Sequence, residues 1–278
     1  EIGTGDWSSD VCSSDLQTPV YNCFFSSIRN NGCVMVSSPL VYENNTYHID
    51  FEDLENKASD PDVKLMLLCN PHNPACRVWT EAELRRIGDI CIKHSVMVVS
   101  DEIHCELVFG DNKYIPFASV SDEFLSHSVT CVSPSKAFNI AGLQIANIVC
   151  SDAAMRTKID RAINDNEVCD VNPFGVIATQ AAYRDGEEWL SQLLDYIWNN
   201  YLYMKDFCSK YLPQFPVAVL EGTYLAWMDC RVLNMPAEKL EEDLIQKVKL
   251  WLNAGTMYGA EGEGFLRWNL ACPRARLE

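Results

Sequence analysis

The sequence predicts an α/β protein with a mainly parallel sheet, and three observations support this fold class. Short apolar runs alternate with longer amphipathic runs from residue 33 onward. These apolar runs lack the alternation of a half-exposed strand, as expected for strands that are covered on both faces. Of the 278 residues, 48% are hydrophobic and 22% are charged, so the chain can bury a large core in one or two domains.

Four apolar runs are interpreted as strands of this sheet: residues 63–69, 96–102, 128–133 and 145–150. The stretch between the first two is a predicted crossover helix. In it, Thr80 and Glu83 have the spacing of a capping box, and apolar residues recur at helical intervals. A strand, helix, strand order of this kind places ligands beyond the carboxyl ends of the strands.

The second half of the chain has a different pattern. Two helical stretches come first, and then a strand, a helix and a last strand, at residues 174–185, 187–212, 223–230, 236–252 and 264–272. We therefore expect a large domain over residues 17–185, a long connecting helix over residues 186–214 and a smaller C-terminal α+β domain over residues 215–278.

The first sixteen residues differ from everything that follows. "EIGTGDWSSDVCSSDL" repeats Ser-Ser-Asp and shows neither helical nor strand periodicity. The stretch resembles the conceptual translation of a sequencing adapter, so residues 1–16 are interpreted as an artefact and are left out of the predicted fold. A disordered polar tail is the alternative. Native sequence is expected to resume near Gln17.

Charge and cysteine usage exclude several classes of function. A formal net charge of −17 disfavours nucleic acid and anionic membranes, which bind through Lys and Arg. No apolar stretch approaches the roughly 18 residues of a membrane span. The 13 cysteines lie largely in apolar runs without C-x-x-C spacing, and the five histidines are scattered, so we expect reduced thiols, no metal site and a cytoplasmic location.

Polar clusters follow three of the predicted strands. They are "NPHNPACR", "SDEIHCE" and "SPSKAFN", and they should converge on one crevice because carboxyl ends of parallel strands meet at one edge. Asn73, Asp101 and Lys136 are the parts that a pyridoxal 5′-phosphate (PLP) site requires. The carboxylate keeps the pyridine nitrogen protonated, the amine forms a Schiff base with the aldehyde, and the amide donates to the phenolic oxygen of the ring.

The segments "CNPHNPACRVW", "DEIHCELVF" and "SPSKAFNIAGLQ" resemble the fold-type I PLP enzymes of the class I/II aminotransferase superfamily. The resemblance is greatest to the MalY/PatB-type cystathionine β-lyase branch, and it covers Gln17 to Glu278. It implies a PLP transferase fold, truncated at the N-terminus, with a homodimer as the full-length form. It also implies that a longer N-terminal region precedes "QTPVY" in the family, so the chain is interpreted as a fragment.

The resemblance also assigns roles to single residues. Lys136 would carry the cofactor, Asp101 would pair with the pyridinium, and Asn73 would contact the 3′ oxygen. The remaining roles are stacking on the ring by Tyr21, phosphate binding by Ser133 and Ser135, and capture of the substrate carboxylate by Arg267. His104 occupies the place where many aminotransferases have a tyrosine that contacts the phenolic oxygen.

Each of these residues also has a structural interpretation. Lys136 could be a solvated surface lysine, Asp101 a helix cap and Asn73 a turn residue. Arg267 could extend from an edge strand into solvent, and His104 could be a buried structural histidine. The combination of matching segments favours the functional interpretation.

The function predicted from the resemblance is C–S β-lysis of a sulfur amino acid. Lys136 would remove the Cα proton, and the substrate would be cleaved to a thiol, pyruvate and ammonia. Transamination begins with the same proton removal, so a class I/II aminotransferase is the alternative. Gln144 favours the lyase, because many aminotransferases have a phosphate-binding arginine there. A second alternative is an inactive fragment, or a protein-binding regulatory module, without PLP or turnover.

Overall fold

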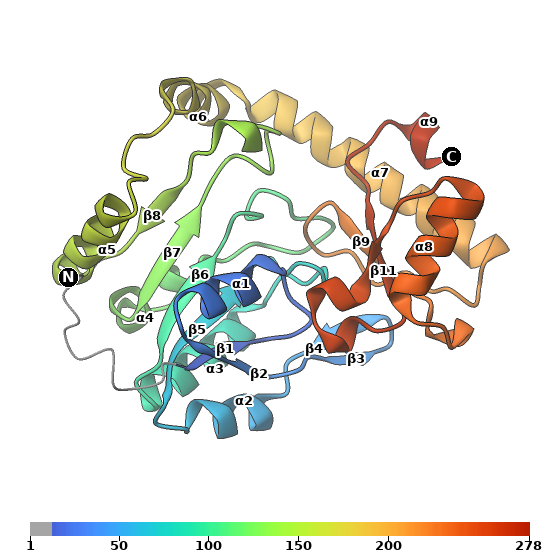
Figure 1. The fold of residues 1–278 in the computed structure, drawn as a ribbon. Helices are drawn as coiled ribbons and strands as arrows, with labels where there is room; N and C mark the ends of the chain where they lie inside the picture. Colours follow the sequence, from blue (N-terminus) through green and yellow to red (C-terminus); the bar gives the residue numbers. More distant parts are fainter. Residues whose placement is uncertain (1–12) are drawn as a thin grey trace.

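The computed structural model describes residues 13–278 and contains a six-stranded sheet (Figure 1). Its strand order is β2 (Val34–Ser37), β1 (Ser13–Leu16), β5 (Val63–Cys69), β6 (Met97–Asp101), β7 (Ser128–Val132) and β8 (Asn147–Val149). All neighbouring strands are parallel except β7 and β8, which are antiparallel. The predicted α/β class and mainly parallel sheet are confirmed.

The register of the central strands aligns their carboxyl ends. Cys69 of β5 lies opposite Asp101 of β6, and Asp101 lies opposite Cys131 of β7. The N–H of Asn70 donates to the carbonyl of Asp101 at 2.9 Å, which extends this alignment by one residue. The polar segments that follow the three strands therefore leave the sheet side by side.

Helix α3 (Glu81–Lys93) connects β5 to β6, as predicted. It begins with the expected capping box, in which Glu83 N donates to Thr80 Oγ1 at 3.3 Å and Thr80 N donates to Glu83 Oε2 at 2.8 Å. Leu84 and Ile87 on its inner face are fully buried. The other helices before β7 are α1 (Cys23–Asn30), α2 (Phe51–Ala58) and α4 (Asp122–Ser126).

Two sequence-based expectations about strands are wrong. Residues 13–16 form β1, which pairs in parallel with both β2 and β5, although residues 1–16 were expected to carry no strand. Leu16 is fully buried in a small cluster with Val20 and Ile28, which anchors this strand. Residues 1–12 lie outside the described residues, and the adapter interpretation stays a prediction.

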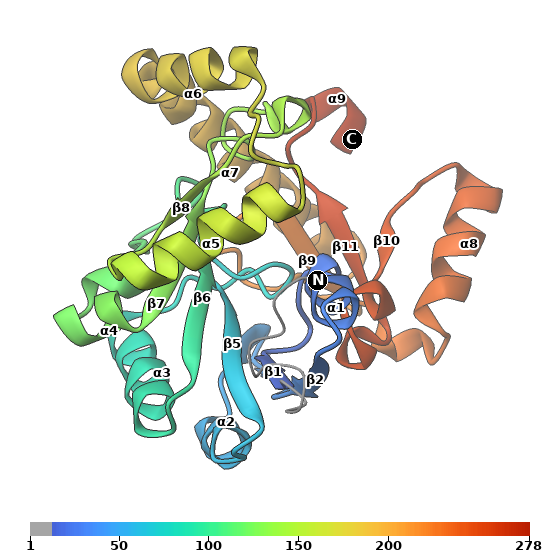
Figure 2. The same ribbon diagram turned by 60° about the vertical axis from the view of Figure 1, so that its left-hand side comes forward.

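Strand β8 was expected to be buried on both faces, and this expectation is also wrong. All three of its residues are exposed, with Ile148 at 45% and Val149 at 52%. The physical reason is its position: β8 is an antiparallel edge strand, and the described residues leave its faces uncovered. Figure 2 shows α5 (Ala153–Asp165) beside this end of the sheet, on the opposite side of the molecule from α8 (Ala237–Val248).

The second half has the predicted order of elements. Helix α6 (Pro173–Asp185) leads into α7 (Glu187–Tyr211), which runs from the α6 side of the molecule to the α8 side (Figure 1). Gly186 separates the two helices, and a Cβ atom there would lie 2.4 Å from the carbonyl oxygen of Ala182. A three-stranded antiparallel sheet follows, in the order β10 (Asn253–Ala254), β11 (Phe265–Asn269) and β9 (Leu225–Asp229). The last helix is α9 (Arg274–Leu277).

One hydrophobic core joins the two sheets. Trp227 of β9 stacks on Phe265 of β11 with ring centroids 5.3 Å apart, and its indole N–H donates to the hydroxyl of Tyr47 at 3.0 Å. Tyr47 belongs to the hairpin of β3 (Val41–Glu43) and β4 (Thr46–His48). The core thus holds the end of the parallel sheet against the antiparallel sheet. None of the helices within residues 13–278 has the length and apolar composition that crossing a membrane requires.

Candidate active site

A cavity of about 290 Å³ lies where the carboxyl ends of β5, β6 and β7 meet β9 and β11. This volume is near the lower end of the range for small-molecule sites. The lining residues are Tyr21, Cys69, Asn73, Asp101, Ile103, His104, Lys136, Tyr224, Leu225, Arg267 and Asn269. Six of the eight residues predicted for the site therefore lie together, although they come from segments distributed over most of the chain.

Asp101 is the last residue of β6 and points a carboxylate into this cavity. Its Oδ1 accepts a hydrogen bond from the N–H of Ile103 at 3.1 Å. Burial raises the pKa of this carboxyl, and the Ile103 N–H and the charge of Lys136 oppose that rise. Within residues 13–278 no cation forms a salt bridge with Asp101, so the site offers a half-buried carboxylate that a cationic ligand would stabilise.

Lys136 follows β7 in a turn whose backbone is firmly held. Phe138 N donates to Pro134 O at 2.9 Å, and Ile140 N donates to Ser135 O at 3.1 Å. The residues on both sides of Lys136 are buried, whereas the lysine itself is half-buried and lines the cavity. In the described part of the chain no hydrogen bond or salt bridge engages its ammonium group. The amine is thus positioned in the cavity and available for chemistry.

Arg267 enters the cavity from β11 and is fixed by three contacts. Its Nη1 donates to Asn73 Oδ1 at 3.1 Å and its Nη2 donates to Asn253 Oδ1 at 3.0 Å. The guanidinium also lies over the ring of Tyr258, 4.5 Å from the centroid. Burial lowers the pKa of Arg267, and no carboxylate among the described residues pairs with it. A half-buried, oriented guanidinium without a counter-ion has the geometry and charge to bind a carboxylate.

His104 is buried in the cavity wall, with 3% of its surface exposed. Its Nδ1 has no hydrogen-bond partner, and its ring meets that of Tyr224 edge-on with centroids 5.8 Å apart. Burial, together with the charges of Lys136 and Arg267, lowers the pKa of His104 to about 3, so the imidazole is neutral at physiological pH. A buried ring nitrogen without a hydrogen-bond partner is costly.

Tyr21 lies at the cavity just before α1 and is half-buried. A side-chain hydrogen bond with Cys23, together with burial, raises the pKa of its phenol to about 12. Ser133 and Ser135 are buried but are not among the lining residues. Ser133 Oγ donates to Ile145 O at 2.6 Å and accepts from Ser135 N at 3.1 Å, which closes the turn before Lys136. Their phosphate-binding role stays a prediction.

Several cavity residues were missed by sequence reasoning. Cys69 and Ile103 adjoin the predicted segments, so the strand-end rule could have included them. Tyr224, Leu225 and Asn269 come from the antiparallel sheet, to which the rule for parallel strand ends does not apply. Asn253, which holds Arg267, lies in a strand of only two residues that carries no periodic signal.

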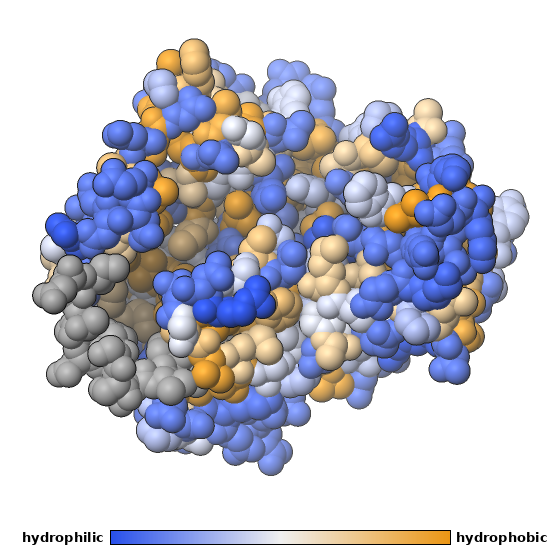
Figure 3. Space-filling model, viewed as in Figure 1, coloured by the Kyte–Doolittle hydropathy of each residue, from blue (hydrophilic) through white to orange (hydrophobic). Residues whose placement is uncertain are grey.

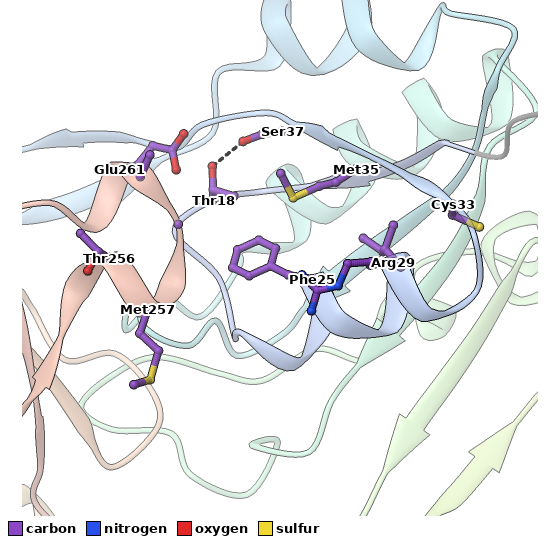
Figure 4. Close-up of a pocket in the computed structure, with 12 residues that line it drawn as sticks. Thr18, Phe25, Arg29, Cys33, Met35, Ser37, Thr256, Met257 and Glu261 are labelled. Carbon is purple, nitrogen blue, oxygen red and sulfur yellow. Dashed lines mark hydrogen bonds between the residues drawn. The ribbon is translucent and has the colours of Figure 1, made fainter.

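A second and larger cavity, of about 470 Å³, lies between α1, β2 and the turns at residues 255–262 (Figure 4). Phe25, Met35 and Met257 contribute apolar lining, and Thr18 and Ser37 share a hydrogen bond of 2.6 Å at its edge. None of the predicted site residues lines it. No lysine lines it, so of these two cavities only the smaller one presents a lysine amine.

The residues of the smaller cavity fit PLP. Asp101 is a half-buried carboxylate for a protonated ring nitrogen, Lys136 is an amine for an aldehyde, and His104 lines the same cavity. No zinc-type ligand cluster occurs among the described residues, and the donor set is that of an organic cofactor and an amino acid.

Comparisons with known proteins agree with this chemistry. The model of the aminotransferase class I and II family matches residues 16–278. Cystathionine beta-lyase PatB of Bacillus subtilis is 42% identical, over 95% of this chain and 68% of the relative, and the protein MalY of Escherichia coli is 33% identical, over 98% and 69%. The crystal structure of cystalysin from Treponema denticola, which contains PLP, superposes with a TM-score of 0.94 at 33% identity, over 96% of this chain and 68% of the other.

These similarities extend over nearly the whole chain and include all of the cavity residues. They confirm the resemblance to the PatB and MalY branch that the sequence segments indicated, and they confirm the PLP transferase fold. The chain belongs to the aminotransferase class I and II family.

Proposed function

We propose that the protein is a PLP-dependent C–S β-lyase that cleaves cystathionine or a related cysteine S-conjugate. The observation that carries this proposal is the placement of Lys136, Asp101 and Arg267 around one cavity. The names of the relatives support the reaction: PatB is a cystathionine beta-lyase, and cystalysin contains PLP. The overall reaction consumes one water, breaks the C–S bond at Cβ and yields a thiol, pyruvate and ammonia.

When bound, PLP supplies an electron sink for the electron pair left by the broken Cα–H bond. Lys136 would hold the cofactor covalently at rest, and its amine would accept the Cα proton of the substrate as a general base. Asp101 would accept a hydrogen bond from the ring nitrogen and favour its protonated form, because a partly buried carboxylate favours a cationic partner. Loss of a sulfur leaving group from Cβ then completes the cleavage.

Arg267 orients the substrate through its carboxylate. Its two amino groups are already directed by Asn73 and Asn253, so the guanidinium is held in one orientation before the substrate arrives. Asn73 lines the cavity and accepts from Arg267 through its Oδ1, so its amide N–H group would donate to the 3′ oxygen. Tyr21 would cover the ring, and Ser133 and Ser135 would bind the phosphate.

Transamination is the alternative reaction, because the family includes aminotransferases. A decisive test supplies the purified protein with PLP and cystathionine and measures pyruvate and the amino group separately. The lyase produces pyruvate and ammonia without a keto-acid acceptor. An aminotransferase transfers the amino group only when an acceptor is present. A protein that takes up no PLP and shows no turnover would instead support a protein-binding or regulatory role.

We further propose that the full-length protein is a cytoplasmic homodimer. An apolar patch lies over α6 and its flanks, where Figure 3 shows hydrophobic residues gathered on the surface. Its most exposed members are Val168, Phe174 and Ile177, at 64%, 72% and 63%. A patch of this kind is typical of a surface that another subunit covers. The domain division at residues 185 and 215, with α7 as the connector, is part of the same proposal.

A further inference from the structure

Tyr224 is a cavity residue with no role assigned above. It comes directly before β9, and its carbonyl oxygen accepts a hydrogen bond from Leu270 N at 2.8 Å. Leu270 follows β11, the strand that carries Arg267. The ring of Tyr224 lies edge-on to His104, with the planes at 73°. The phenol is therefore anchored beside the sheet that supplies Arg267, and Tyr224 lines the same cavity as that arginine.

The residue before it has an unusual backbone conformation. Thr223 is fully buried and has a φ of 68°, which is rare for a β-branched residue. Its N–H donates to Leu107 O at 2.8 Å, and its Oγ1 accepts from Leu225 N at 3.2 Å. In a regular strand, successive side chains face opposite sides, yet Tyr224 and Leu225 both line the cavity. Strained backbone at a cavity indicates a functional constraint, here the direction of Tyr224.

The hydroxyl group of Tyr224 is free to bind a ligand. Within residues 13–278 it makes no hydrogen bond with another side chain or with the backbone. Burial raises the pKa of the phenol, so the group keeps its proton at neutral pH, while the nearby charge of Arg267 opposes that rise. The phenol is thus a neutral hydrogen-bond donor close to a guanidinium that lacks an anion.

We propose that Tyr224 is a specificity-determining residue that donates its phenolic hydrogen bond to the substrate carboxylate held by Arg267. The inference rests on the proposed function only in taking the ligand to be an amino acid. The two donors together recognise the negative charge of the carboxylate, so an amino-acid ester gains nothing from Tyr224.

The test measures binding without C–S cleavage. L-Alanine and L-alanine methyl ester are titrated against the PLP-loaded parent, Y224F and Y211F, and dissociation constants are read from the cofactor absorbance. Tyr211 is 57% exposed and lies at the end of α7, so Y211F is a matched control. We expect Y224F to weaken alanine binding by about 10-fold to 100-fold, because a hydrogen bond to a charged group is lost. The dissociation constant of the ester should change by less than about twofold in Y224F. Y211F should bind both ligands as the parent does.

Two results would overturn the inference. Equal weakening of acid and ester by Y224F would show a steric or structural role, and unchanged alanine binding would show that the phenol does not reach the carboxylate. Because alanine has no sulfur leaving group, this outcome is independent of whether the protein is a lyase. Failure of the lyase proposal would instead appear as the absence of pyruvate from cystathionine.

A second measurement tests directly whether Arg267 and Tyr224 bind the same carboxylate. The same alanine titration is made with R267K and with the double variant R267K and Y224F. If both side chains hold one carboxylate, the loss in the double variant is smaller than the product of the two single losses. Strictly multiplicative losses would contradict the inference. T223G, which removes the Oγ1 contact and frees the backbone, should weaken alanine binding while leaving ester binding unchanged, and equal effects on both ligands would contradict the directing role of Thr223.

Discussion

Arg267 and Asn73, which are 194 residues apart in the sequence, join across the cavity through a hydrogen bond of 3.1 Å. Arg267 belongs to the antiparallel sheet and Asn73 to the segment after β5 of the parallel sheet. The contact therefore spans the boundary between the two halves of the site. It joins the residue proposed to bind the substrate carboxylate to the residue proposed to contact the cofactor oxygen.

The first prediction concerns Asp101 and activity. Asp101→Asn keeps the size of the side chain but removes the charge that holds a proton on the ring nitrogen. We expect the rate of pyruvate formation to fall by at least about 100-fold, which is the lower range for losing a preorganised charge at a reacting group. Steady-state kinetics at saturating PLP make the measurement. Asp89→Asn on α3, away from the cavity, is the control, and a D101N enzyme with more than a tenth of parental activity would contradict the role.

Asp101 also affects stability in the absence of cofactor. Burial raises the folded pKa of this carboxyl above its unfolded value, so its stabilising contribution is complete at pH values below the unfolded pKa. That contribution is lost as the pH rises through the folded pKa. PLP-free D101N should therefore be more stable than the parent at pH 7, and the difference should disappear toward pH 3 to 4, near the unfolded pKa of about 3.9. Urea denaturation at both pH values checks this, and an unchanged difference would contradict it.

The lowered pKa of His104 predicts that stability depends on pH with a sign opposite to that for Asp101. Its folded pKa is lowered to about 3, whereas an unfolded histidine titrates near 6.5. The unfolded chain therefore binds an extra proton as the pH falls below about 6.5, and this destabilises the fold by about 1.4 kcal/mol per pH unit. His104→Gln should reduce the slope of unfolding free energy against pH, between pH 6 and 4, by that amount.

His72 provides a matched comparison for this effect. It is fully buried, its Nε2 contacts Gln17 O at 3.0 Å, and burial likewise lowers its pKa to about 3. It does not line the cavity. H72Q and H104Q should flatten the pH slope equally, but only H104Q should shift the cofactor absorbance. Slopes that remain parental in both variants would show that these imidazoles are not held neutral by the fold.

The ion pairs of Arg77 lie outside the cavity, and they predict that substitution of this residue has a large effect on stability. Its Nε donates to Glu221 at 2.8 Å and its Nη2 to Glu83 at 2.9 Å, with only 6% of the residue exposed. Arg77→Met leaves two carboxylates without their cation, which typically costs about 3 to 5 kcal/mol. Arg85→Met removes an exposed pair with Glu81 and should cost less than about 1 kcal/mol. Chemical denaturation distinguishes the two, and equal costs would contradict the account of this buried network.

The parallel sheet and its helices were largely predictable because local and global signals agree there. Strand β5 has the predicted bounds, since a run that is apolar apart from Lys64 is bounded by polar residues, and α3 begins with a complete capping box. Asp101 and Lys136 could be placed together because parallel strands align their carboxyl ends. That rule needs only that the strands run parallel in one sheet, which the alternation of strands and helices along the sequence predicts.

Tertiary context decided what the sequence did not reveal. Strand β8 is as apolar as its neighbours, and no local signal shows that it lies exposed at the sheet edge. Strand β1 consists of "SSDL", and its pairing with β2 and β5 depends on neighbours distant in sequence. Tyr224 was not predicted as a site residue, because the strained backbone of Thr223, rather than strand periodicity, directs it into the cavity.

Reduction of the PLP-loaded protein with borohydride, followed by peptide mass spectrometry, tests the central claim most directly. The reagent fixes the cofactor on whichever amine holds it. We predict a pyridoxyl group on the peptide that contains Lys136, with loss of that label and of the visible absorbance in K136A but not in K113A, whose lysine is exposed. A label on a different lysine, or none on the parent protein, would contradict the account.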